Sequence, residues 1–531
     1  MEESSSLISN LNYFVSSRTK FLMMSLLLLL NLVMRLPSTP HEQGYDSFFI
    51  HSLANSITTY GHANWWTHWL SVFGLYPYSY GSAVPFPLSG ISQITGIPME
   101  FTILIYCILL GVFTIFTSYL LASVFYTSFI SRFLFSFLFS LSAATMTLTT
   151  WQLTTRAQFL VFFPFFVYQT YKILNGDKKF IILSVLTFIF VYATHHYANF
   201  LIAFSILIFM TFLLHRVGSK IQVSYSKYLN VNYLYLVITL SLFVIPFLFS
   251  GKVGLIEYGS RYSWVISMII TSIRNLGPVF PLSLGGFVYL SLKKFKSYQE
   301  WSILLCILPT IVFSFDPVYG YLINYLLLII MGVEGVINIV RNYKKDRKFL
   351  LSFLVLLLLL VVTFSCFFAH WKLGTQGGYD DWYMQENTYV TGQWIKDSLN
   401  PNAIGFFDGF EADRMYASYG GTPVVYGLNS ILNYINGFIA FNNSDLIENS
   451  IYSKEFYFEG AYFLKNDIDS TGLISWLSEL TVTDPRTIGF LKGTNISFFI
   501  EDKNMQSVFT SSLASNKDKI CDVGRMRVWL I

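Results

Sequence analysis

Charge is scarce in this sequence. Only 12% of its 531 residues are Asp, Glu, Lys or Arg, whereas 54% are hydrophobic. A soluble protein of ordinary composition carries about 25% charged residues. Because so few charges do not cover the surface of a water-soluble chain of this length, the composition excludes a large soluble enzyme and indicates an integral membrane protein.

Cysteine is scarce as well. Three of the four cysteines, Cys107, Cys306 and Cys366, lie within apolar runs, which leaves Cys521 alone in the C-terminal region. That region therefore has no second thiol for an internal disulfide. It also lacks a glycine-rich phosphate-binding loop and a nucleophile elbow, so we expect no nucleotide or hydrolase chemistry from it.

Charged residues are nearly missing from the apolar runs except at or next to the run ends, and Glu334 is the exception. Ion-coupled pumps usually need carboxylates or cations at mid-membrane depth. This scarcity therefore argues against a pump.

The charges that are present are divided unevenly. Residues 1–370 hold 22 Lys and Arg against 11 Asp and Glu, and residues 371–531 hold 12 against 19. The change of sign marks a domain boundary near Trp371. Because the C-terminal region is acidic, it would repel phosphate backbones, and we expect no nucleic acid partner.

Apolar runs bounded by Lys and Arg, or by Gly and Pro, follow one another through the first 370 residues. They lie at about 20–36, 100–124, 132–150, 157–174, 180–194, 198–214, 231–249, 276–292, 301–315, 319–340 and 349–369. The last is the clearest, because its uncharged residues cross a bilayer core at about 1.5 Å per residue. We therefore expect a polytopic α-helical membrane protein with about 11 transmembrane helices.

Residues 180–214 fit either two short spans or one long kinked span, since only Thr194–Tyr197 interrupts them. Counting two spans places 17 of the 22 basic residues in this part of the chain on the cytoplasmic side, as the positive-inside rule favours. We therefore expect an integral plasma membrane protein with a cytoplasmic N-terminus. Its first span would be a signal anchor, and its C-terminal domain, residues 371–531, would be extracytoplasmic.

A long outer loop, residues 37–98, separates the first two runs. Connections are usually about 4–6 residues long, and much longer ones often carry function. This loop is rich in aromatic residues, including Trp65 and Trp66, so we expect it to be folded on the membrane surface. Asp46 opens an amphipathic pattern that predicts a helix to about Tyr60.

Five basic residues remain on the predicted outer side, against the topology rule: Arg35, Arg156, Lys252, Arg261 and Arg274. A basic side chain there suits an anionic partner such as a lipid-linked phosphate, and contact with ordinary lipid headgroups is the alternative. Arg274 precedes Gly277-Pro278, where we expect a short outer helix to turn into the membrane.

Histidines also gather on the predicted outer side, with seven of the eight in outer loops or at outer helix ends. They lack the H-x-x-x-H spacing of a metal site, so packing among aromatic side chains is the simpler interpretation. His51, His195 and His196 are possible accessory site residues, and so is Glu257, close to Arg261.

The run Gly44–Ile57 (GYDSFFIHSLANSI), followed by Tyr60-Gly61, Tyr76–Gly81 and Pro87–Gly90, resembles the first outer loop of GT-C glycosyltransferases. It is most similar to that of the oligosaccharyltransferase catalytic subunit and its archaeal relatives. The resemblance implies a helical membrane domain followed by an extracytoplasmic α/β domain. It also implies transfer of a sugar or oligosaccharide from a polyprenyl-(pyro)phosphate-linked donor to a protein, glycan or lipid acceptor at the outer membrane face.

In that superfamily the loop aspartate, matched here by Asp46, is a metal ligand or the catalytic acid/base. As a ligand it would hold a divalent cation, Mg²⁺ or Mn²⁺. As a base it would act on the acceptor hydroxyl, while the donor phosphate would be neutralised by Arg156, Arg261, Lys252 and Arg274. The second outer loop, residues 150–156, lacks the acidic pair of the oligosaccharyltransferase subunit, which argues against metal-dependent transfer to asparagine. A helix N-cap is the structural alternative for Asp46.

The C-terminal region has the pattern of an α/β domain. We expect a helix over 386–399 and strands over 403–407, 497–501 and 525–531. Its expected role is to bind the acceptor or to cover the membrane site. Two other functions fit the same chain: a lipid or polysaccharide transporter or flippase with the long loop as a gate, and a non-catalytic surface-binding membrane protein. Membrane lipids are partners in each case.

Overall fold

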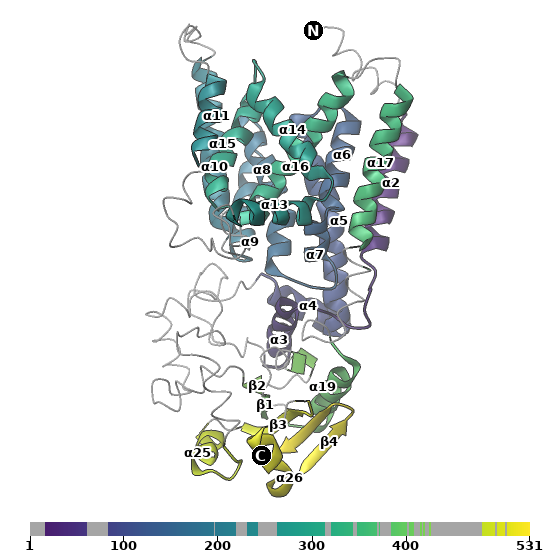
Figure 1. Ribbon diagram of the computed structural model, residues 1–531, viewed down its shortest axis with the longest axis vertical. Coiled ribbons are helices and arrows are strands. Elements are labelled where there is room, and N and C mark those ends of the chain that lie inside the picture. The colour runs from purple at the N-terminus through teal and green to yellow at the C-terminus, as the bar shows by residue number, and fades with distance from the viewer. Residues whose placement is uncertain are drawn as a thin grey trace.

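The computed structural model describes residues 16–60, 83–195, 197–218, 231–242, 263–313, 320–342, 348–368, 371, 384–400, 403–407, 415–416, 418–419, 424–425, 480–493, 496–504 and 507–531. Helices from the first 370 residues form one bundle, and a small sheet from the C-terminal residues lies beyond one end of it (Figure 1).

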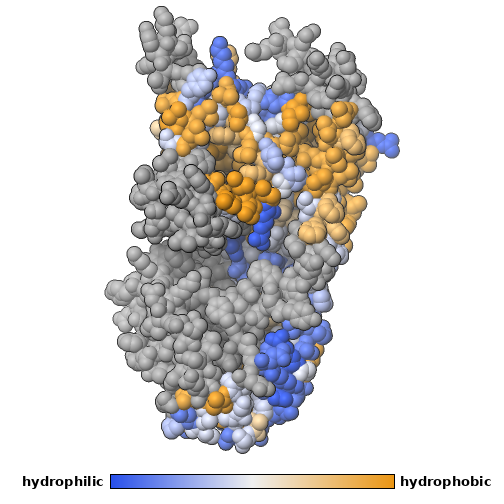
Figure 2. Space-filling view, in the orientation of Figure 1, coloured by the Kyte–Doolittle hydropathy of each residue, from blue (hydrophilic) through white to orange (hydrophobic). Residues whose placement is uncertain are grey.

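The bundle contains most of the apolar runs as helices. Its members are α2 (Ser17–Met34), α5 (Met99–Phe125), α6 (Phe129–Ser140), α7 (Ala143–Thr149), α8 (Thr155–Leu174), α9 (Phe180–Tyr192), α10 (Ala198–Gly218), α11 (Val231–Leu242), α13 (Ser263–Leu276), α14 (Val279–Leu292), α15 (Tyr298–Phe313), α16 (Gly320–Asn342) and α17 (Lys348–Phe367). Large apolar side chains are exposed on its outside, as at Ile182 (73%) and Leu240 (66%). Figure 2 shows them gathered over the helical part of the molecule, as a lipid-facing surface requires.

Within the described residues, three single helices are long and apolar enough to cross a membrane: α2, α5 and residues 198–217 of α10. Two bent helix pairs pass the same test when each pair is taken as one span. The structure therefore supports a helical membrane protein, and the number of 11 spans stays a prediction.

The run 180–214 forms two helices, as the charge distribution favours. The chain breaks between α9 and α10, and Ala193 accepts a backbone hydrogen bond from Ala83 of the first outer loop at 3.2 Å. At its other end, α10 brings His215 against Tyr298, whose hydroxyl donates to Asn175 at 2.7 Å. Ala193 therefore lies at the end of the bundle that faces the outer loop.

Both bent pairs depart from simple spans. The expected span 132–150 is broken into α6 and α7, which are inclined by 55°. The short helix expected before Gly277-Pro278 is present as α13, and it meets α14 at 112°. Gly277 has φ +56°, a conformation that side chains disfavour, and Pro278 then starts the next helix, so these two residues account for the sharp turn.

The first outer loop is folded where the structure describes it. It contains α3 (Tyr45–Tyr60), as the amphipathic pattern predicts, and α4 (Pro85–Thr95). Both helices lie between the bundle and the C-terminal sheet (Figure 1). The tryptophans of the loop, Trp65 and Trp66, lie outside the described residues.

The C-terminal domain contains α19 (Glu386–Ser398), α25 (Pro485–Gly493), α26 (Val508–Asn516) and one five-stranded sheet. Its strands are β1 (Ile404–Phe407), β2 (Val424–Val425), β3 (Ile496–Asp502), β4 (Lys519–Val523) and β5 (Met526–Leu530), in the order β2-β1-β3-β5-β4. The first three are parallel, and β5 pairs antiparallel with β3 and β4. The predicted helix and three predicted strands are confirmed, whereas β2, β4, α25 and α26 were not foreseen.

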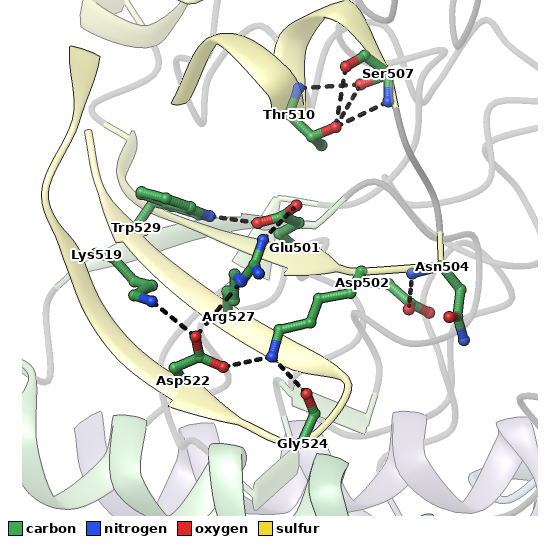
Figure 3. Close-up of polar contacts among 11 residues, drawn as sticks. Glu501, Asp502, Asn504, Ser507, Thr510, Lys519, Asp522, Gly524, Arg527 and Trp529 are labelled. Atoms are coloured by element: carbon green, nitrogen blue, oxygen red, sulfur yellow. Dashed lines mark hydrogen bonds and ion pairs between the residues drawn. The ribbon is translucent and has the colours of Figure 1, made fainter. Parts of the chain in front are cut away.

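One face of the sheet is apolar, and the other carries charged side chains beside the buried Phe499, which packs on Phe509 of α26. Ile395 of α19 packs with Phe498, Ile500 and Val528 on the first. On the second, Trp529 Nε1 donates to Glu501 Oε2 at 2.7 Å, while Lys503 and Lys519 both bind Asp522 (Figure 3). Those two hydrogen bonds lower the pKa of Asp522 to about 2. Charged side chains on β4 also discourage pairing of this edge strand with another chain.

Helices α14 and α16 approach each other closely through glycine. A Cβ added at Gly286 would lie 1.8 Å from the carbonyl oxygen of Met331, whereas one added at the adjacent Gly285 would meet nothing within 4 Å. Small residues at helix interfaces allow such backbone contact in membranes.

We therefore expect Gly286→Val to destabilise the bundle and Gly285→Val to leave it unchanged. Overpacking of this kind costs about 1–3 kcal/mol, because the helices must separate or shift. Thermal unfolding of the two variants in the same detergent measures the difference. Equal melting temperatures would show that this glycine contact is not tight.

Candidate active site between the first outer loop and helix α8

Asp46 lies in the first turn of α3, and two contacts fix the approach to that helix. Gln43 N donates to the carbonyl oxygen of Trp151 at 3.1 Å. Gly44 follows with φ +93°, and a Cβ there would lie 2.6 Å from Cγ of Gln152. Glycine thus permits both the left-handed turn and the close packing. The start of α3 therefore rests directly on the segment that leads into α8.

Arg156 lies in the first turn of α8, whose N-cap is Thr154: the Thr154 Oγ1 accepts from Ala157 N at 3.2 Å. Arg156 Nη2 donates to Asp46 Oδ2 and forms an ion pair with it. The Asp46 side chain is 39% exposed and the Arg156 side chain is 26% exposed. The pair is therefore accessible to a substrate, and it lies where the N-termini of two helices meet and favour negative charge.

The structure describes only some of the other predicted site residues. Lys252, Glu257, Arg261 and His196 lie outside the described residues. Arg274 is exposed in the last turn of α13. Its predicted role toward a donor phosphate therefore stays a prediction.

The two described accessory histidines differ in their surroundings. His195 accepts a hydrogen bond from Tyr197 N at 3.2 Å and packs on the Tyr197 ring, which fits the packing interpretation. His51 is buried, and its Nδ1 lies 2.9 Å from Oε2 of Glu42, which is also fully buried. Burial raises the pKa of the Glu42 carboxyl, and the neighbouring His51 opposes that rise.

Sequence reasoning missed Glu42 and Glu100. Glu100 Oε1 lies 3.1 Å from Nδ1 of His41, whose Nε2 lies 3.3 Å from Oε2 of Glu386 in the C-terminal domain. A signal for both was available: Glu42, Asp46 and Glu100 are the only acidic residues between positions 4 and 176. All three lie in or beside the first outer loop, at the same end of the bundle.

The C-terminal domain packs on the helix that carries Asp46. Phe48 of α3 is buried with Met384, Met415 and Tyr419. Asn55 of α3 donates to the carbonyl oxygen of Ser418. Burial, with the charges of Glu42 and Glu100, raises the pKa of Tyr419 well above its ordinary value. This domain therefore covers one side of α3, and its role toward the site stays a prediction.

The described residues do not fit a divalent cation at Asp46. One oxygen of its carboxylate is bound by the Arg156 guanidinium, which puts a positive charge where a metal would lie. No group of three His, Cys, Asp or Glu within the described parts of the chain is arranged to hold a metal ion. The Mg²⁺ or Mn²⁺ implied by the resemblance therefore has no set of ligands among these residues.

An apolar cavity of about 490 Å³ opens beside the bent pair α13–α14. Met268, Ile269, Phe280 and Ile307 are among its lining residues, and Asn275 and Asn324 add polar groups. Its chemistry suits a hydrocarbon chain, because a largely apolar lining with few polar groups is typical of lipid and ligand sites.

No family model matches the sequence, and no curated protein matches it either. Solved structures match nearly the whole chain. The oligosaccharyltransferase of Archaeoglobus fulgidus, tethered to an acceptor peptide, is 10% identical with a TM-score of 0.56, and the match covers 93% of this chain and 70% of that one. ArnT of Cupriavidus metallidurans, bound to undecaprenyl phosphate, is 11% identical with a TM-score of 0.52 and coverage of 96% and 97%.

The arabinofuranosyltransferase AftD from Mycobacteria is 13% identical with a TM-score of 0.51, and the match covers 97% of this chain and 41% of that one. The chain has the fold of GT-C glycosyltransferases. At these identities the likeness concerns the fold, and the chain spans about two-fifths of AftD. Within this fold, Asp46 lies in the segment between α2 and α5, and its catalytic role stays a prediction.

His41 contacts Glu100 at the start of α5 and Glu386 of the C-terminal domain, so the packing of α19 on the first loop should depend on pH. Burial opposes protonation of His41, but the hydrogen bonds and charges of Glu100 and Glu386 outweigh it and raise its pKa above 6.5. A raised histidine pKa stabilises the folded state fully below the unfolded value, and the contribution is lost as pH rises through the folded value. We therefore expect the seating of α19 on the first loop to weaken above about pH 6.5.

Hydrogen exchange of α19 between about pH 6 and pH 9, corrected for intrinsic rates, measures this seating. We expect His41→Gln to flatten the pH dependence, and His215→Gln, at the other end of the bundle, to preserve it. An unchanged slope in the His41 variant would show that another group is responsible.

Proposed function

We propose that the chain transfers a sugar or oligosaccharide from a polyprenyl-(pyro)phosphate-linked donor to an acceptor at the outer membrane face. The accessible pair of Asp46 and Arg156 carries the proposal, because it places a carboxylate and a guanidinium together at the first outer loop of a GT-C fold. The proposed topology is the one expected from charge, with a cytoplasmic N-terminus and an extracytoplasmic C-terminal domain in the plasma membrane.

In the proposed reaction Asp46 is the general base. Its carboxylate takes the proton of an acceptor hydroxyl, and the acceptor oxygen forms a bond to the anomeric carbon of the donor sugar. The bond from that carbon to the phosphate oxygen breaks, and its electron pair stays on the polyprenyl phosphate. Arg156 stabilises the negative charge that develops there, assisted by the N-terminus of α8.

Arg156 must change its partner during this reaction. In the structure it binds Asp46, whereas the proposed reaction needs its guanidinium at the donor phosphate. An arriving phosphate would draw Arg156 away and leave both carboxylate oxygens free to accept the acceptor proton. The ion pair is therefore the resting arrangement of the proposed site.

Two further observations support a lipid-linked donor. The apolar cavity beside α13 and α14 offers room for part of an isoprenoid chain. Among proteins with the same fold, ArnT was determined with undecaprenyl phosphate and the Archaeoglobus enzyme with an acceptor peptide. For this chain we leave the acceptor as a protein, a glycan or a lipid.

Loss of the carboxylate should abolish transfer. We expect Asp46→Asn, in purified protein in nanodiscs, to lower consumption of a polyprenyl-phosphate-linked sugar by about 100-fold or more, since general bases contribute about 10²–10⁴ in rate. Arg156→Gln should also lower the rate at which the donor is consumed. Asp177→Asn, a matched change beside Lys179 at the opposite end of the bundle, should act like the unmodified protein.

Mass spectrometry of the donor lipid over time measures this, with melting temperature as a check of folding. Full turnover by the Asp46 variant would remove that residue from the mechanism. If the unmodified protein consumes none of a panel of polyprenyl mono- and diphosphate sugars, the proposed transfer is wrong.

Filling the cavity should affect long donors selectively. We expect Ile307→Trp to raise KM about tenfold for a donor with a long isoprenoid chain and to leave a short-chain analogue unaffected, because only the long chain needs that space. Ile182→Trp, on the exposed face of α9, is the matched control. An equal effect on both donors would show that the isoprenoid chain of the donor binds outside this cavity.

A further inference from the structure

Arg35 is a fully buried arginine without a carboxylate partner among the described residues. It follows α2 directly, as its C-cap residue. The sequence suggested either an anionic partner or contact with lipid headgroups, whereas the structure buries this side chain among neutral acceptors of the described residues. A buried cation normally needs strong compensation, so what replaces a counter-ion here requires an explanation.

Neutral acceptors from three helices surround the guanidinium. Its Nε donates to Thr149 Oγ1 at 3.0 Å, and its Nη2 donates to the carbonyl oxygen of Ser140 at 3.1 Å. Its Nη1 donates to Oδ1 of Asn31 at 2.7 Å and to the carbonyl oxygen of Asn31 at 3.2 Å. Asn31 is held in turn by its own bond to Ser140 Oγ at 3.1 Å.

These acceptors lie at helix C-termini. Ser140 is the last residue of α6, Thr149 is the last residue of α7, and Asn31 lies in the last turn of α2. Each helix C-terminus carries a partial negative charge of roughly half an elementary charge. The carbonyl groups at the ends of α2 and α6, together with the Thr149 hydroxyl and the Asn31 amide oxygen, therefore take the place of a carboxylate as acceptors for this guanidinium.

Gly111 of α5 makes room for this arrangement. A Cβ at this position would lie 1.8 Å from Nε of Arg35. The guanidinium therefore lies directly against the α5 backbone. A methyl group there would displace it from its acceptors without changing its charge.

Two segments run from this cluster to the proposed site. One leads from Arg35 to Asp46, and the other leads from Thr149 to Arg156. They are joined on the way by the bond from Gln43 N to the carbonyl oxygen of Trp151. We propose that Arg35 is a positioning residue that fixes the break between α6 and α7 and thereby sets Asp46 opposite Arg156.

This inference rests on the proposed function only for its catalytic consequence. A misplacement of about 1 Å at a reacting group costs about 100-fold in rate. We therefore expect Arg35→Lys, whose ammonium lacks the planar fork, and Gly111→Ala each to lower kcat by about 10- to 100-fold, with KM for the donor within about twofold. Because both disturb one arrangement, the double variant should be no worse than the poorer single variant.

Hydrogen exchange gives a readout that needs no activity. Peptides covering residues 36–46 and 149–156 should exchange about tenfold faster in both variants, while β3, β4 and β5 stay unchanged. Arg132→Lys, at the opposite end of α6, and Gly285→Ala, which faces open space, are the matched controls.

The outcomes separate the two proposals. Faster exchange of both segments in a protein that consumes no donor would support the positioning role and contradict the proposed function alone. Normal turnover with unchanged exchange in the variants would overturn the positioning role alone. Faster exchange throughout the chain, or additive losses in the double variant, would also overturn it, because Arg35 would then support the fold in general.

Discussion

The ion pair between Asp46 and Arg156 joins the two halves of the candidate site. One partner comes from the first outer loop and the other from a helix of the bundle, and both lie in the first turn of their helix. In a chain with so few charges, a carboxylate and a guanidinium that meet at an accessible position mark the place where charged chemistry is available.

Helix ends provide the electrostatic setting on both sides of this site. The N-termini of α3 and α8 meet at the pair of Asp46 and Arg156, and the C-termini of α2, α6 and α7 surround the buried Arg35. Anions are favoured at helix N-termini and cations at C-termini. The bundle thus places helix N-termini, with partial positive charge, at the pair of Asp46 and Arg156, and helix C-termini, with partial negative charge, at Arg35.

The C-terminal domain contacts the same loop that carries Asp46. It covers α3 through Phe48 and Tyr419, and it reaches the first loop through His41. The same helix therefore carries the proposed base on one side and supports a domain interface on another.

Much of this architecture could be predicted from sequence, because lipid exposure imposes long apolar runs. The short helix before Gly277-Pro278 was predictable too, since glycine followed by proline breaks a helix in a defined way. The bend between α6 and α7 was not, because the contacts of Arg35 with the Ser140 carbonyl and the Thr149 hydroxyl join positions 105 and 114 residues apart.

At the site, Asp46 was predictable from the loop pattern and Arg156 from its position against the topology rule. Their pairing was not, because it depends on how two distant segments pack at Gly44 and Gln152. Glu42 and Glu100 were missed because their partners, His51 and His41, are identified only by the fold. The short strands β2 and β4 were missed because their pairing is set by distant neighbours in the sheet rather than by local pattern.

A structure of the full chain in a nanodisc with a bound polyprenyl phosphate tests the central claim most directly. The account predicts that the phosphate contacts Arg156, that Asp46 no longer pairs with it, and that the isoprenoid chain runs toward α13 and α14. A phosphate bound elsewhere, with the ion pair of Asp46 and Arg156 intact, would contradict it.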